Sequence, residues 1–229
     1  ILKTNKCFYV TFQKWDALVF LHSTASVFCM HFGRRRKTKY IQFPLENPSG
    51  SHRDPCLLED AGVPVVLATG NVRPITYGLW RFLGLSAPMC CENGGVLWHP
   101  SWKEPMLRAT ATEAKEAAQW LATQLEGVDP NGIATNRWRE SEWCLYPDDP
   151  LASIVEAMNR SAWSHLSVVR TGFAIHLMEP HLSKGEGLRV LFDRMGWSVD
   201  DALCVGDAPN DLPMFELLHW SVAVGGAFE

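Results

Sequence analysis

Two aspartates, Asp207 and Asp211, are the side chains of this sequence whose type and spacing point most directly to chemistry. They lie in residues 206–211, which read Gly-Asp-Ala-Pro-Asn-Asp and follow an apolar run over residues 202–205. Such a run predicts a buried strand, so both carboxylates are expected on the loop that leaves it. Two carboxylates that converge there can bind one hard cation such as Mg²⁺. The same segment is also typical of a capped helix start, because Asn210 and Asp211 are good N-cap residues.

The elements that would place these carboxylates follow a strand–loop–helix order that occurs twice. Residues 63–68 form a continuous apolar run, as in a buried parallel strand, and residues 69–71 (Thr-Gly-Asn) form the turn after it. The pattern then predicts a helix over residues 74–82. The order returns at Lys184, where a helix over residues 185–195 leads to the strand before the two aspartates. This alternation predicts a parallel α/β sheet, and ligands of such sheets bind outside the carboxyl ends of the strands.

The middle of the sequence has a different character. Helices are predicted over residues 111–125 and 151–159, while residues 132–146 and 167–178 alternate polar and apolar side chains, as strands with one exposed face do. Helices on one face of an antiparallel sheet form an α+β unit. We therefore predict an α/β fold, with a Rossmann-like parallel-sheet core and an inserted α+β cap domain.

The predicted domains divide the chain at two points. Its 229 residues can hold one large domain or two small ones. The predicted core consists of residues 1–97 plus 181–229, and the predicted cap consists of residues 98–180. The sequence leaves open whether residues 1–53 form the first strand and helix of the core, because their apolar clusters have no clear period.

Composition and charge exclude several classes of partner. The formal net charge is −4, so neither nucleic acid nor another polyanion is expected. The apolar stretch 17–32 is shorter than the about 20 residues of a membrane helix, and the basic run 34–37 is typical of a solvated loop, so no membrane partner is expected. The seven cysteines form no C-x-x-C pair. This argues against a zinc site or a disulfide framework and predicts a cytoplasmic protein with reduced thiols.

Five motifs, taken in order, carry a family resemblance. They are 65–72 (VVLATGNV), 92–95 (ENGG), 135–140 (TNRWRE), Lys184 and 206–211 (GDAPND). Together they resemble the haloacid-dehalogenase superfamily of phosphatases, and specifically the archaeal-type phosphoglycolate phosphatases. The resemblance covers residues 58 to 228, about three quarters of the chain.

The resemblance implies a Mg²⁺-dependent phosphatase that hydrolyses a small phosphoester such as 2-phosphoglycolate. In this superfamily an aspartate attacks phosphorus and forms an aspartyl-phosphate, which water then hydrolyses. Asp207 and Asp211 would hold Mg²⁺, directly or through water, and Asn210 would orient one of these carboxylates or a metal-bound water. The implied cofactor is Mg²⁺, and the implied partner is a small phosphorylated metabolite.

The resemblance also assigns the groups that bind the phosphoryl oxygens. Thr69 would donate its hydroxyl, and the following turn, Gly70 and Asn71, would donate backbone N–H groups. Lys184 would bridge the nucleophile and the phosphate as a compact point charge. Two other interpretations stay open, because Thr69 is also a suitable helix cap and Lys184 is also typical of a solvated residue in a first helical turn.

The first motif of the family, D-x-D-G-T at the end of the first strand, is missing from this chain. In the family its first aspartate is the nucleophile and its second is the acid/base. Asp16 is the only aspartate before Asp54, and it precedes an apolar run where the nucleophile should follow one. Three interpretations compete: a fragment or mis-started reading, an inactive relative that still binds phosphate, and an active enzyme with a relocated nucleophile. We expect impaired activity.

Three further side chains of the predicted cap have open roles. Arg137 and Arg139 are suited to bind a substrate carboxylate in a bidentate manner, although one of them is as well suited to face solvent. His176 lies between apolar neighbours, which is more typical of a partly buried histidine with satisfied hydrogen bonds than of a catalytic one. The sequence does not determine the oligomeric state and leaves a homodimer open.

Overall fold

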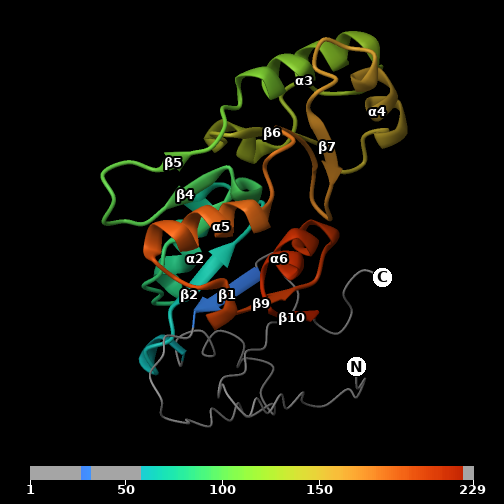
Figure 1. Cartoon of the computed structure of the whole chain (residues 1–229). Coiled ribbons are helices and arrows are strands. Elements are labelled where there is room, and N and C mark those ends of the chain that lie inside the picture. Colours follow the sequence, from blue (N-terminus) through green and yellow to red (C-terminus); the bar gives the residue numbers. More distant parts are fainter. Residues whose placement is uncertain (1–26, 32–57, 224–229) are drawn as a thin grey trace, which may run out of the picture.

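The computed structural model describes residues 27–31 and 58–223, which form two β-sheets and the helices around them (Figure 1). The larger sheet has seven strands in the order β10 (Trp220–Ala223), β9 (Ala202–Gly206), β1 (Val27–His31), β2 (Val65–Ala68), β3 (Met89–Cys91), β4 (Val96–Trp98) and β5 (Met106–Leu107). The smaller sheet has three strands in the order β6 (Glu142–Leu145), β8 (Ile175–Met178) and β7 (Ser167–Arg170).

The predicted parallel core is present in β10, β9, β2 and β3, with β1 reversed between β9 and β2, and β4 runs antiparallel to β3 at the side of β5. Strands β9 and β10 are parallel, as are β2 and β3, whereas β1 lies antiparallel to both β9 and β2. Its Phe28 pairs with Leu67 on one side and Val205 on the other. The Val27 end of β1 therefore lies at the carboxyl ends of its two neighbours. Most of residues 1–53, including Asp16, lie outside the described residues, and so does Asp54.

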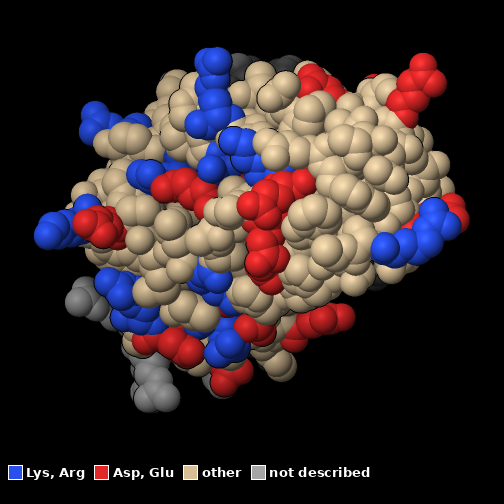
Figure 2. Space-filling view, turned by 90° about the horizontal axis from the view of Figure 1, so that it is seen from above, with Lys and Arg blue, Asp and Glu red and all other residues tan. Residues whose placement is uncertain are grey.

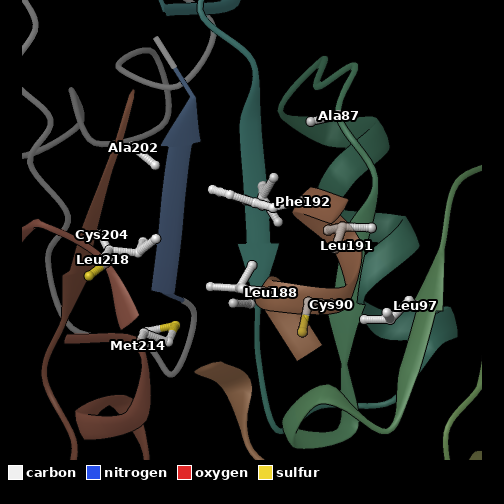
Figure 3. Close-up of a cluster of buried hydrophobic side chains, with 12 residues drawn as sticks. Ala87, Cys90, Leu97, Leu188, Leu191, Phe192, Ala202, Cys204, Met214 and Leu218 are labelled. Carbon is white, nitrogen blue, oxygen red and sulfur yellow. The ribbon is translucent and has the colours of Figure 1, made fainter. Parts of the chain in front are cut away.

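Helices cover both faces of this sheet. The bounds are α2 (Arg73–Phe82), α5 (Lys184–Met195) and α6 (Leu212–Leu217). Successive side chains of a strand point to opposite faces, so Val65 and Leu67 join the apolar cluster beside α2, whereas Val66 and Ala68 join the cluster beside α5 and α6. Figure 3 shows the second cluster, to which α5, β3, β9 and α6 contribute side chains. Continuous apolar runs in the strands follow from this burial on both faces.

The second apolar core lies around the three-stranded sheet. Helices α3 (Thr112–Gln124) and α4 (Leu151–Asn159) cover this sheet and share a buried cluster with β6 and β8. Figure 1 shows this unit above the seven-stranded sheet, at the side where the parallel strands end. The boundaries 98–180 stay a prediction. Within that range, β5 pairs with β4 and thereby belongs to the larger sheet.

One predicted strand is wrong over much of its length. Only β6 is extended within residues 132–146, and the residues before it form the short 3-10 helix η3 (Ala134–Trp138). The Asn136 side chain explains the difference, because its amide donates to Cys144 O at 2.7 Å and accepts from Cys144 N at 3.1 Å. Those bonds hold a turn against the strand. Gly132 begins it at φ 56°, where a side chain would also meet Cys144 O.

Two surface properties bear on the expected partners. In the described ranges no helix is both long and apolar enough to span a bilayer. The face in Figure 2 carries Lys and Arg side chains intermixed with Asp and Glu. Nucleic-acid sites use a basic patch or stripe, which this mixed face does not form. The absence of a nucleic-acid partner stays a prediction.

Candidate functional site

A buried ion pair joins the start of α5 to the loop after β9. Lys184 Nζ donates to Asp211 Oδ1 at 2.6 Å, and both side chains are almost fully buried. Ser183 caps α5 by accepting from the Glu186 N–H, which places Lys184 in the first turn. A lysine there is mildly disfavoured by the helix dipole, so the carboxylate of Asp211 provides the reason for its position.

The other oxygen of Asp211 organises the loop itself. Asp211 Oδ2 accepts the backbone N–H groups of Asp207 at 2.9 Å and of Ala208 at 3.0 Å. A Cβ at Gly206 would lie 2.7 Å from the same oxygen, so glycine is required for this close approach. In contrast, the carboxylate of Asp207 is half-buried, and no described residue hydrogen-bonds to it. The loop therefore presents one engaged carboxylate and one open carboxylate.

The turn after β2 is the second part of the site. Thr69 is buried, and its Oγ1 accepts the Asn71 N–H at 3.1 Å, so the hydroxyl holds the turn that follows it. Thr69 N donates to Cys90 O at 2.9 Å, and Thr69 O accepts from Asn93 N at 3.1 Å. These bonds fix the turn to the end of β3 and place it at the carboxyl edge of the sheet.

Asn93 connects this turn to the loop after β9 and to the cap. Its Oδ1 accepts from Asn210 Nδ2 at 3.1 Å, and its Nδ2 donates to Glu142 Oε2 at 3.1 Å. Asn93 has φ 51°, a left-handed conformation that asparagine tolerates better than most residues. We name Thr69, Lys184, Asp207, Asn210 and Asp211 the strand-end cluster. One amide side chain thus links the strand-end cluster to the three-stranded sheet.

A second polar cluster lies in the cap and consists of Arg139, Glu142, Cys144 and His176. Arg139 forms an ion pair with Glu142 and also donates from Nη1 to Gly70 O at 3.1 Å. His176 Nδ1 lies 3.1 Å from Glu142 Oε2 and 3.2 Å from Cys144 Sγ. We name these four residues the cap cluster. The Arg139–Gly70 contact places it directly against the turn after β2.

Electrostatics keep the cap cluster charged. Burial raises the pKa of Glu142, but His176 and Arg139 more than offset that effect and the pKa lies below its ordinary value. Burial lowers the pKa of Arg139, and the charge of Glu142 outweighs this so that the pKa is raised. The carboxylate and the guanidinium therefore stay ionised, and neither leaves an isolated buried charge.

A cation does not suit the cap cluster, although three of its groups have ligand atoms. Those atoms of Glu142, Cys144 and His176 all lie within 4.8 Å of one another. Burial raises the pKa of Cys144 well above its ordinary value, so the thiol keeps its proton, and a metal ligand must lose it. A cation would also face the Arg139 guanidinium. The cluster therefore fits an ion-pair network better than a metal site.

Glu92 fastens the end of β3 to the segment that enters β6. Its Oε2 accepts from Glu140 N, Ser141 N and Ser141 Oγ at 2.9 to 3.0 Å. Burial, together with the nearby charge of Glu142, raises the pKa of Glu92 to about 7. Glu92 is thus a buried acid that joins the two sheets, and it titrates near neutrality.

The structure brings most of the predicted site residues together. Lys184 and Asp211 are in direct contact, while Asn93 joins the Thr69 turn to Asn210. Arg137 does not belong to the site, because it is exposed and lies over the Trp138 ring. The site assignments themselves stay predictions.

Several residues at the site were missed by the sequence reasoning. His176 is fully buried, not partly, and its Cε1 would lie 3.4 Å from a Cβ at Gly70. Glu92, Asn93 and Glu142 were not considered as site residues. The ENGG motif was the available signal for the first two, whereas no pattern marked Glu142.

The chemistry of the donor set fits Mg²⁺. This ion prefers carboxylate oxygens and binds through one or two carboxylates while keeping several waters. Asp207 offers a carboxylate to which no residue in the described ranges hydrogen-bonds, and Asp211, with one oxygen on Lys184, retains further lone pairs. Among the described residues these two would hold the ion.

Sequence comparisons identify a matching family and similar proteins. A model of the haloacid dehalogenase-like hydrolase family matches residues 144–229. The phosphoglycolate phosphatase of Methanothermobacter thermautotrophicus is 34% identical over 170 residues, which cover 74% of this chain and 73% of that protein. The phosphoglycolate phosphatase of Haloarcula marismortui is 36% identical over 168 residues, which cover 72% of each.

Solved structures have the same fold. A Thermoplasma acidophilum protein superposes with a TM-score of 0.67 and 25% identity, covering 76% of this chain and 75% of that one. A haloacid dehalogenase-like hydrolase from Bacteroides thetaiotaomicron gives a TM-score of 0.63 at 19% identity, covering 78% and 82%. By its relatives and its fold, this chain belongs to the haloacid dehalogenase-like hydrolase family.

Proposed function

We propose that the strand-end cluster binds and hydrolyses small phosphoesters such as 2-phosphoglycolate with the help of Mg²⁺, and that hydrolysis is impaired because the first motif is missing. The observation that carries the proposal is the buried Lys184–Asp211 ion pair, which shares the carboxyl edge of the sheet with the Thr69 turn. Fixed donors at such an edge can offset charge on a phosphoryl group. The substrate is suggested by the phosphoglycolate phosphatases among the relatives.

Each residue has a role that follows from its contacts. Lys184 carries three N–H donors, of which one is directed at Asp211, so it can hold a phosphoryl oxygen as well. Thr69 would donate its hydroxyl hydrogen to another oxygen, while Gly70 and Asn71 would present backbone N–H groups. Asp207 and Asp211 would hold Mg²⁺, which offsets the repulsion between anionic reactants. Asn210, held by Asn93, would orient the open carboxylate.

The nucleophile is the missing part of the mechanism. In an aspartyl-phosphate mechanism a carboxylate oxygen forms a bond to phosphorus and the alcohol leaves. The strand between β9 and β2 is β1, whose sequence VFCMH contains no carboxylate. This observation favours a second candidate function, a protein that binds phosphoesters at the same site without turning them over.

Two measurements separate these candidates. Release of inorganic phosphate from 2-phosphoglycolate and from p-nitrophenyl phosphate should be slow, should depend on Mg²⁺ and should vanish in Asp207→Ala. Calorimetry should show Mg²⁺-dependent, saturable binding of inorganic phosphate even where no turnover occurs. Turnover that survives Asp207→Ala would contradict the catalytic proposal, and a lack of phosphate binding would contradict both candidates.

A further inference from the structure

Unpaired buried donors are concentrated in one segment of the cap. Three buried side-chain polar atoms of the described chain have no hydrogen-bond partner, namely Thr135 Oγ1, Arg139 Nε and Arg139 Nη2. All three belong to residues 135–139. A buried donor without a partner costs about 1–3 kcal/mol, and more where the group is charged. Native proteins leave few such groups, so this segment calls for an acceptor that the described residues do not supply.

The two free nitrogens of Arg139 form one edge of its guanidinium. Nη1 is used by Glu142 and by Gly70 O, which leaves the Nε–Nη2 edge. That edge is suited to a carboxylate, because its two parallel N–H bonds match two carboxylate oxygens. The thiol of Cys144 interacts with the guanidinium, but a protonated thiol is a weak acceptor and accepts no hydrogen bond from this edge.

In Arg73 the same Nε–Nη2 edge of the guanidinium is bound by a carboxylate. Its Nε donates to Glu140 Oε2 at 2.8 Å and its Nη2 donates to Glu140 Oε1 at 3.0 Å. Arg73 is only half-buried, whereas the Arg139 side chain is fully closed to solvent. The more buried arginine therefore has the greater need for acceptors, and its Nε–Nη2 edge has none among the described residues.

The position of Arg139 relates this edge to the proposed phosphoryl site. Its Nη1 lies 3.1 Å from the carbonyl oxygen of Gly70, the residue after Thr69. In 2-phosphoglycolate the carboxylate carbon is only two bonds from the ester oxygen. A phosphoryl group at the Thr69 turn would therefore leave the carboxylate close to Arg139. His176 also lies near Gly70, with its Cε1 3.4 Å from the position that a Cβ of Gly70 would take.

We propose that Arg139 is the specificity-determining residue of this site and that its Nε–Nη2 edge binds the carboxylate of the substrate. The preferred substrates are then phosphoesters with a carboxylate close to the ester oxygen. The inference rests on the proposed function, because it takes the Thr69 turn as the phosphoryl site. The edge is sealed in this conformation, so substrate entry requires residues 135–139 to move away from Gly70.

Calorimetry with two matched ligands tests the proposal. We would titrate the Mg²⁺-loaded protein with 2-phosphoglycolate and with ethyl phosphate, which has no carboxylate. The wild type should bind 2-phosphoglycolate more tightly by about tenfold or more. Arg139→Gln should lose that preference and leave ethyl phosphate binding within about threefold, whereas Arg137→Gln, an exposed control, should change neither.

Additional arms keep the outcomes separate. Arg139→Lys retains the charge beside Glu142 without the two-pronged edge, so it should fold even where Arg139→Gln does not, and it should restore only part of the preference. Glycolate alone should protect the wild type against thermal unfolding but should not protect Arg139→Lys to the same extent. Equal losses for both phosphoesters, or an unchanged preference in Arg139→Lys, would overturn the proposal. If the wild type binds neither phosphoester yet glycolate protection depends on Arg139, then the proposed function fails and the carboxylate subsite stands.

Discussion

The strand-end cluster and the cap cluster differ in how completely their charges are paired. Lys184 and Asp211 satisfy each other, and two backbone N–H groups complete the carboxylate. In the cap cluster, Glu142 has several partners, but one edge of Arg139 has none in the part of the chain that the structure describes. The Lys184–Asp211 pair is thus complete without a ligand, although the Asp207 carboxylate beside it stays open, whereas the guanidinium of Arg139 is only half used. This difference suggests that the strand ends provide a preformed phosphoryl site and that the cap provides selection.

The largest expected effect comes from breaking the strand-end ion pair. Lys184→Met should lower the free energy of unfolding by about 3–5 kcal/mol, because it leaves the buried Asp211 carboxylate without its cation. Urea unfolding at neutral pH measures this loss. Lys184→Met/Asp211→Asn should recover part of it, since asparagine is neutral and still accepts from the loop N–H groups.

Lys103→Met is the matched control for that experiment. Lys103 is exposed, and its replacement should change the free energy of unfolding by less than about 0.5 kcal/mol. If Lys184→Met and Lys103→Met cost equally little, the ion pair would be no more than a surface contact. The contrast between the clusters would then disappear.

The strand-end cluster could be predicted from sequence because its signals are local. Asp207 and Asp211 lie on one loop after an apolar run, and Thr69 directly follows another run, so periodicity alone places them at strand ends. The motif resemblance added Lys184. Parallel strands then bring these separate loops to one edge without any knowledge of side-chain packing.

The cap cluster could not be predicted in that way. Arg139, Glu142 and His176 meet only after a 3-10 helix and three strands have packed, and no residue pattern encodes that meeting. The alternation around β8 placed His176 among apolar residues and made it look structural. Strand direction could not be predicted either, because the sequence of an apolar run such as Val27–His31 does not distinguish a parallel from an antiparallel pairing.

The second expected effect concerns Glu92, the acid that joins the end of β3 to the segment before β6. Its pKa is raised from 4.5 to about 7 in the folded state, so folding favours the protonated form. Between these two pH values the folded chain binds more protons than the unfolded chain, and stability falls as pH rises. The fall should amount to about 3 kcal/mol. Glu92→Gln cannot ionise and should lack this contribution.

Paired unfolding curves of the wild type and Glu92→Gln from pH 4.5 to 8 measure the effect. The difference between the two free energies of unfolding should shift in favour of the variant as pH rises, and should level off above about pH 7. Exposed Glu104→Gln serves as the control for a Glu→Gln replacement at the surface. A flat difference for Glu92→Gln would mean that Glu92 ionises as freely when folded as when unfolded.

The smallest effect, and the one that most sharpens the comparison, is expected at Glu142. Burial raises the pKa of this acid, but His176 and Arg139 overcome burial and bring the pKa below 4.5, so folding favours the ionised form. Its stabilising contribution is therefore present above about pH 4.5 and is lost as pH falls through the folded pKa. At pH 7, Glu142→Gln should cost about 2 kcal/mol, because a hydrogen-bonded charge beside Arg139 is replaced by a neutral amide.

The pH dependence of that cost distinguishes the two buried glutamates. The destabilisation caused by Glu142→Gln should shrink as pH falls below 4.5. The stability that Glu92 contributes to the wild type should instead grow as pH falls from about 7 to 4.5. The two variants should thus shift the pH profile of unfolding in opposite directions, although both acids are fully buried. If Glu142→Gln instead shifted the pH profile of unfolding in the same direction as Glu92→Gln, the Arg139 charge would not be lowering the pKa of Glu142. The cap cluster would then not be the ion-pair network on which carboxylate selection depends.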